Sequence, residues 1–236
     1  MKKSIKNIVE MKTDFIKIIG VMLLMGMFAC TQAPKSDEAA ASAPKSENKP
    51  AATASSASSF NIDAEKSLVT WVGTKPTGRH NGTLSISKGV INVRDGSVVS
   101  GKFNIDMKSL KALDQDEEAN KNLAGHLMSD DFFKVSANPT SSFVITGVQP
   151  FKAEAGKEVL LKGATHNVTG NLTMLGVTKS ITFPAFINIS GNTLNARSNF
   201  NIDRTEWGVT YGNDESLGDK FIRPTVNLGF NLVARQ

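Results

Sequence analysis

The feature that most constrains this chain is an alternation of apolar and polar residues with a period of two, which begins at Phe60. It is clearest in residues 165–174, 194–202 and 225–232. Successive side chains of a β-strand point to opposite faces, so the pattern predicts strands with one buried face and one solvated face. Such strands are typical of antiparallel sheets.

Turn signals divide this region into short strands. Lys88-Gly89, Asp95-Gly96 and Gly191-Asn192 are the clearest, and their spacing indicates about eight to ten strands. A sheet of that size closes into a barrel or packs as a sandwich. The sequence therefore predicts an all-β fold, and most simply an antiparallel barrel.

One segment breaks the period of two. Asp114 with Glu117 three residues later resembles a helix capping box, and Ala119, Leu123 and Leu127 follow at a spacing of four. This spacing predicts one inserted α-helix over about residues 115–128.

The apolar faces of the strands define a candidate interior. A barrel of about eight strands either packs solid or holds one ligand, and the pattern alone leaves both open. The candidate lining residues are Phe103, Ile105, Phe143, Ile145, His166, Val168, Leu172, Met174, Phe183, Phe200, Ile202, Leu228, Phe230 and Leu232.

Four residues are candidates for contact with a polar head group. His166 has the parity of the apolar face, so it is either a core or strand-end histidine or a head-group partner. Arg79 and His80 lie in a glycine-flanked stretch and are candidate rim residues, and Arg204 is either a structural residue or a head-group contact.

The N-terminus resembles a bacterial lipoprotein signal. A basic stretch precedes an apolar core in residues 18–29, which has the length of a signal-peptide core and is too short to span a membrane. The core ends directly before Cys30, the chain's single cysteine. We expect residues 1–29 to be removed and Cys30 to be acylated; the alternative is an ordinary signal peptide with an incidental cysteine.

Residues 30–59 are rich in alanine, serine and proline and contain no large apolar side chain. Such a segment cannot repay the entropy of ordering by apolar burial. We therefore expect a disordered tether that joins Cys30 to a domain over residues 60–236.

Charge and motif content exclude several functions. The net charge of +5 arises largely in the leader, because residues 60–236 hold 19 Lys and Arg against 17 Asp and Glu. Nucleic-acid binding needs a basic surface on the domain itself, so it is not expected. His80, His126 and His166 lie far apart in sequence, and no metal-ligand spacing or nucleophile motif is present. We expect no cofactor, no metal and no catalysis; a hydrolase using His126 is the weakest alternative.

Several stretches resemble one known family. Residues 125–133 and 138–143, GHLMSDDFF and NPTSSF, are similar to the "HLxSxDFF…yPtatF" signature of the YceI-like proteins. Residues 168–179, VTGNLTMLGVTK, are similar to that family's "vtGdLTixGvTK", and residues 103–107 and 201–204 match two further landmarks. The resemblance implies an extended, lipocalin-like barrel that holds a long isoprenoid or another amphipathic lipid in an apolar tunnel.

Together these features predict a non-enzymatic, lipid-binding protein of the bacterial cell envelope. Acylated Cys30 would anchor it to the outer membrane, on the periplasmic or the surface face, for carriage, storage or stress protection. The alternative is an interaction protein with a solid core, binding a protein partner through a surface around Trp207, Tyr211 and Asp219. The sequence leaves a homodimer open.

Overall fold

The structure is a computed structural model of the 236-residue chain, and it describes residues 32–46, 57–152 and 159–236. The expected signal peptide and Cys30 lie outside the described residues. Among the described residues, no helix is both long enough and apolar enough to cross a membrane.

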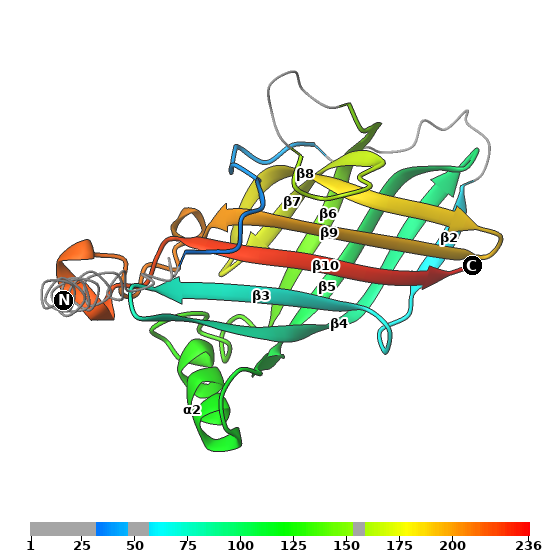
Figure 1. The fold of residues 1–236 in the computed structure, drawn as a ribbon. Helices are drawn as coiled ribbons and strands as arrows, with labels where there is room; N and C mark the ends of the chain where they lie inside the picture. Colours follow the sequence, from blue (N-terminus) through cyan, green and yellow to red (C-terminus); the bar gives the residue numbers. More distant parts are fainter. Residues whose placement is uncertain (1–31, 47–56, 153–158) are drawn as a thin grey trace, which may run out of the picture. The chain divides into compact units, whose positions relative to one another are not determined.

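The described chain forms a closed antiparallel barrel with one α-helix beside it (Figure 1). The sheet closes because β10 pairs with both β9 and β3, and β3 pairs with β4. The long strands pair in chain order from β4 to β10. The strands are β1 (Asp37–Glu38), β2 (Ser58–Ile62), β3 (Leu68–Lys75), β4 (Gly78–Arg94), β5 (Ser97–Ala112), β6 (Thr140–Pro150), β7 (His166–Met174), β8 (Val177–Ser190), β9 (Thr193–Asp203) and β10 (Thr225–Arg235).

The predicted all-β barrel is confirmed, but one predicted turn is wrong. Lys88 and Gly89 lie inside β4, where the register with β5 shifts between Ile86 and Lys88. A Cβ at Gly89 would lie 2.6 Å from the Cβ of Phe103. Glycine at this position therefore allows a close approach between β4 and β5, which explains its presence within a continuous strand.

The predicted helix is also confirmed, as α2 (Glu117–Met128), but its N-cap is Asp116, whose side chain accepts from the amide of Ala119. Asp114 instead accepts from the amide of Asn81 and lies 3.0 Å from Nδ1 of His80. Burial raises the pKa of Asp114, but the hydrogen bonds with Asn81 and His80 lower it by more. The pKa of Asp114 therefore lies below its ordinary value. Asp114 thus ties the link before α2 to β4.

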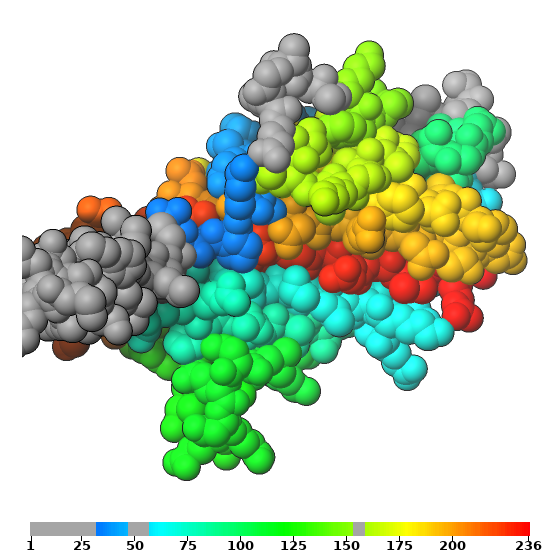
Figure 2. Space-filling model, viewed as in Figure 1, coloured from blue at the N-terminus to red at the C-terminus, as the bar shows by residue number. Residues whose placement is uncertain are grey.

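Strands β8 and β9 separate towards one end of the barrel. They pair only from Ala185 with Ser198 to Ser190 with Thr193. Beyond that point residues 34–45, which we term the strap, lie between them. Within the strap, β1 pairs in parallel with β9, and Ser42 forms an antiparallel bridge with Ser180 of β8. In Figure 2 the strap, coloured blue, lies on the outer surface beside these strands.

The strap is held by polar residues of the outer barrel face. Asn201 donates to the carbonyl of Pro34 and to Glu38, and Asn171 exchanges two hydrogen bonds with the main chain of Lys45. Ala39 is 1% exposed and packs in the core.

The prediction of a disordered tether is therefore wrong for residues 34–45. Main-chain pairing and asparagine side chains order this segment, and neither depends on large apolar residues.

A carboxylate at Ala39 tests whether the strap is part of the folded domain. Ala39→Asp would bury an unpaired charge, which costs several kcal/mol, so we expect the strap to detach. Amide hydrogen exchange should then lose protection in residues 34–45. Ala40→Asp is the matched control because Ala40 is exposed. Equal protection in the two variants would contradict the structure.

Candidate functional site: two apolar chambers inside the barrel

Five phenylalanines fill the middle of the barrel. Their shared property is exposure of 3% or less, and they come from five different strands: Phe103, Phe143, Phe183, Phe200 and Phe230. The ring of Phe230 contacts the other four at centroid distances of 5.2 to 5.8 Å, and Phe183 stacks on Phe200 at 4.1 Å. We term this group the phenylalanine cluster.

On one side of the cluster lies an apolar cavity of about 120 Å³, termed chamber 1. Its barrel wall includes Val69, Trp71 and Leu84, and Phe230 lies at its boundary with the cluster. Segments outside the barrel wall also line it: α2 and the turn after it contribute Leu127, Phe132 and Phe133, and the loop of residues 204–224 contributes Val209 and Ile222. These segments lie at one end of the barrel (Figure 1).

On the other side lies a smaller apolar cavity of about 40 Å³, termed chamber 2. Phe230 lines both chambers. The candidate lining residues divide between the two chambers. Chamber 1 is lined by Ile105, Leu172, Met174, Ile202, Leu228 and Phe230. Chamber 2 is lined by Phe103, Phe143, Ile145, Val168, Phe183, Phe230 and Leu232. Phe200 lies within the cluster. The described side chains thus form two chambers where the sequence led us to expect one continuous tunnel.

Arg204 borders chamber 1 but is committed to the fold. Its side chain is 5% exposed and donates to the main-chain carbonyls of Arg223, Val209, Tyr211 and Ile222. Burial lowers the pKa of Arg204 and neighbouring Asp203 opposes that shift. Arg204 therefore fastens the 204–224 loop to the barrel, which is the structural alternative of the two that the sequence left open.

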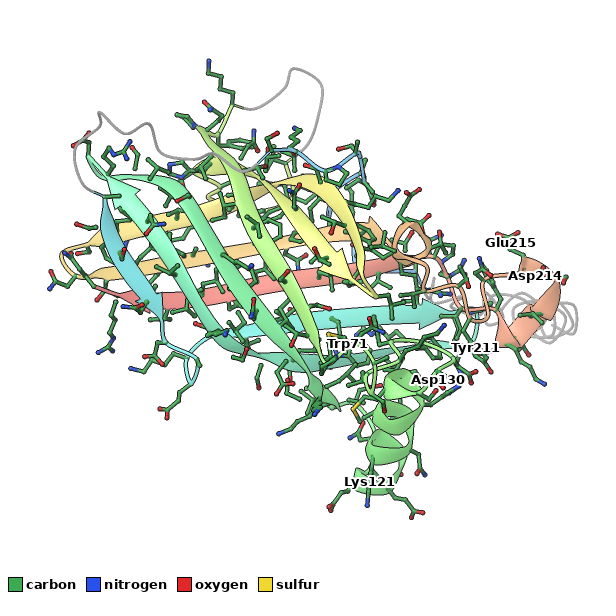
Figure 3. The ribbon with its side chains drawn as sticks, turned by 180° about the vertical axis from the view of Figure 1, so that it is seen from behind. Trp71, Lys121, Asp130, Tyr211, Asp214 and Glu215 are labelled. Atoms are coloured by element: carbon green, nitrogen blue, oxygen red, sulfur yellow. The ribbon has the colours of Figure 1, made fainter. Side chains whose placement is uncertain are left out.

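Trp71 places a buried indole N–H group in the wall of chamber 1. Its indole nitrogen is buried and has no hydrogen-bond partner within the part of the chain that the structure describes. A buried donor left unpaired costs about 1–3 kcal/mol. The indole lies across Gly82, where a Cβ would approach the ring to 2.7 Å. Figure 3 shows Trp71 at the end of the barrel near α2.

Comparison with known proteins agrees with this architecture. The family model described as the YceI-like domain matches residues 60–234. This chain belongs to the YceI-like family. UPF0312 proteins from Pseudomonas aeruginosa and Pseudomonas putida are 35% identical over 100 residues and 36% identical over 92 residues, which is 41% and 39% of this chain. The chain spans about half the length of these curated relatives, 47% and 41%.

Two solved structures share the YceI-like fold. BcnA from Burkholderia cenocepacia superposes with a TM-score of 0.56 at 24% identity, over 73% of this chain and 99% of that one. A polyisoprenoid binding domain from Saccharophagus degradans superposes with a TM-score of 0.52 at 17% identity, over 75% and 97%. At these identities the likeness establishes the fold.

The other candidate head-group residues lie outside both chambers of this YceI-like barrel. His166 begins β7, where its Nδ1 lies 2.8 Å from the hydroxyl of Thr165, and burial lowers its pKa. Its parity is that of Val168, but it is at the strand end and lines neither chamber. His80 holds Asp114, and Arg79 is exposed. None of the three is placed to contact a ligand in a chamber.

Sequence reasoning missed much of the wall of chamber 1. Trp71 could have been found, because Val69, Trp71 and Gly73 share the parity of an inward face. Phe132 and Phe133 belong to the family signature but were not among the candidate lining residues. Their role in the wall depends on how the turn after α2 folds back, which periodicity does not report.

The predicted partner surface around Trp207 is corrected by the structure. Trp207 is 0% exposed, and its indole donates to the carbonyl of Leu172 at 2.9 Å. A hydrogen-bonded, fully buried indole is a core residue and cannot contact a partner. Tyr211 stays 43% exposed and contacts Phe132 and His126.

The remaining histidine has structural contacts. His126 lies 2.9 Å from Asp131 at the surface and packs edge-on against Phe132. Across residues 32–46, 57–152 and 159–236, no group of three or more His, Cys, Asp or Glu is arranged to hold a metal ion.

Glycine substitutions test the phenylalanine cluster. A Cβ at Gly170 would lie 2.2 Å from the ring of Phe143 and 2.7 Å from the carbonyl of Val144. Gly170→Ala should therefore lower the free energy of unfolding by about 1–3 kcal/mol, measured by urea denaturation. Gly147→Ala is the matched control, since its Cβ would meet only Thr169 at 3.8 Å. If both variants were equally stable, the described packing would be wrong.

Proposed function

We propose that this protein binds an isoprenoid or another amphipathic lipid inside its barrel and is anchored in the bacterial cell envelope by acylated Cys30. Its role is carriage, storage or protection of the envelope under stress. The observation that carries the proposal is chamber 1, an apolar cavity enclosed by barrel strands, α2 and the 204–224 loop. The polyisoprenoid binding domain with the same fold adds support.

Burial of apolar ligand atoms supplies the binding free energy. Each buried methylene contributes about 0.8 kcal/mol, so even a short chain gains affinity in such a cavity. The binding needs no cofactor. The His126–Asp131 contact is exposed and lies outside both chambers, so binding without catalysis accounts for the site.

The strap connects the proposed anchor to the end of the barrel that holds chamber 1. Residues 32–36 share a surface groove with Phe221, Arg223 and Pro224, directly beside Ile222 of the chamber wall. Cys30 precedes Pro34 by four residues, which span at most about 14 Å. An acylated Cys30 would therefore hold this end of the barrel close to the lipid surface, where a ligand could enter from the membrane.

The polar groups favour an uncharged ligand. Arg204 already donates to four main-chain carbonyls, so an anionic head group would have to displace them. The unpaired indole N–H of Trp71 can instead donate to a neutral oxygen such as a hydroxyl or a carbonyl.

Filling the chamber tests the site. Gly73 lines chamber 1, and a Cβ there would meet no atom within 4 Å, so Gly73→Leu should occupy the cavity without a clash. Native mass spectrometry of the full chain from a bacterial envelope should show a bound lipid mass that this variant loses. Gly78→Leu is the matched control, because Gly78 also has free space but lines neither chamber.

The proposal fails if the wild-type chain shows only a bare protein mass and takes up no added geraniol, a ten-carbon prenyl alcohol. Retention of the lipid by Gly73→Leu would place the binding site elsewhere.

Removing the indole donor tests the polar contact. Trp71→Phe should weaken geraniol binding by roughly threefold to tenfold, the value of one hydrogen bond, as measured by calorimetry. Myrcene, a ten-carbon hydrocarbon without oxygen, is the matched ligand and should bind both proteins alike. Equal losses for both ligands would mean that Trp71 contributes only packing.

A further inference from the structure

The barrel interior is divided at one level along its axis. Chamber 1 and chamber 2 have separate walls and share one residue, Phe230. Phe103, Phe143 and Phe183 line chamber 2 only, and each of them contacts the ring of Phe230. A ligand chain entering chamber 1 therefore meets the phenylalanine cluster before it reaches the second half of the barrel.

The phenylalanine cluster is packed too tightly for a single ring to move aside alone. Glycines lie directly against two of its members: Gly89 against Phe103 and Gly170 against Phe143. Interiors at crystal-like density do not open without displacing several side chains together. Phe230 is held on four sides by aromatic rings, so the path past it is closed.

The register gives the depth of chamber 1. Val69 of β3 pairs with Phe230 and so marks the level of the cluster, while Gly73 is the outermost chamber residue of the same strand. Four residues of strand cover about 13 Å, roughly the length of two extended isoprene units. This depth is an upper limit, because the volume of about 120 Å³ is smaller than the apolar cavity of about 150 Å³ that holds one benzene molecule.

We propose that the phenylalanine cluster sets the length of the ligand, so that this barrel accepts a prenyl chain of at most about ten carbons and stops a longer one at Phe230. The inference rests on the proposed function, because it assumes that chamber 1 is the lipid site. It makes Phe230 the residue that determines specificity for chain length.

A series of prenyl alcohols tests the inference on the full chain. The probes are prenol, geraniol, farnesol and geranylgeraniol, with five, ten, fifteen and twenty carbons, and binding is followed by tryptophan fluorescence. In a continuous tunnel each added methylene would tighten binding by about fourfold. We expect affinity to rise from prenol to geraniol and then to change by less than about threefold for the longer alcohols.

Phe230→Leu should open the partition and bind farnesol at least about tenfold more tightly than wild type. Phe60→Leu is the matched control: Phe60 is 2% exposed in the core but lines neither chamber, so it should keep the wild-type length profile. If Phe230→Leu does not fold, the dependence of wild-type affinity on the length of the alcohol is sufficient to test the length limit.

The outcomes separate the two proposals. Wild-type binding of geranylgeraniol at least tenfold tighter than geraniol, lost in Gly73→Leu, would overturn the length limit and leave lipid binding in place. A Phe230→Leu profile identical to that of wild type would also overturn it. If no alcohol bound at any length, the proposed function itself would be overturned.

Discussion

Closure of the sheet fixes the space that the interior side chains must fill. The eight strands from β3 to β10 close the barrel, and a barrel of that size is just wide enough for side chains to meet across it. Here five phenylalanines meet at one level. Gly89 and Gly170 lack the Cβ atoms that would clash with Phe103 and Phe143. The cavity of chamber 1 remains at the end where α2 and the 204–224 loop cover the barrel, so the position of the rings decides where a ligand can lie.

The ends of the barrel are held by polar contacts that complement this core. Arg204 secures the 204–224 loop through main-chain carbonyls, Asp114 secures the link before α2, and the strap fills the gap between β8 and β9. Each contact satisfies main-chain groups that the closed sheet leaves unpaired. Because Arg204 is used in this way, the described residues of the chamber present an unpaired indole and no available cation, which suits a neutral lipid.

The fold was predictable from the sequence, whereas the site was predictable only in part. Alternation in residues 194–202 and 225–232 reports which face a residue occupies, so Phe200, Ile202 and Phe230 were assigned to the interior correctly. Alternation does not report depth along the barrel, so it could neither separate the two chambers nor decide whether His166 is a core residue, a strand-end residue or a ligand contact. The sequence of the strap shows no apolar pattern, because hydrogen bonds from asparagine side chains and main-chain pairing hold it in place.

The most direct test of lipid binding in chamber 1 is a crystal structure of the full chain purified with its bound lipid or soaked with geraniol. We expect electron density for a prenyl chain in chamber 1, with its hydrocarbon end at Phe230 and its oxygen within hydrogen-bond distance of the indole nitrogen of Trp71. Density that continues past Phe230 between Phe103 and Phe143 would contradict the division of the barrel. Density found only on the outer surface would contradict the chamber as the site of binding.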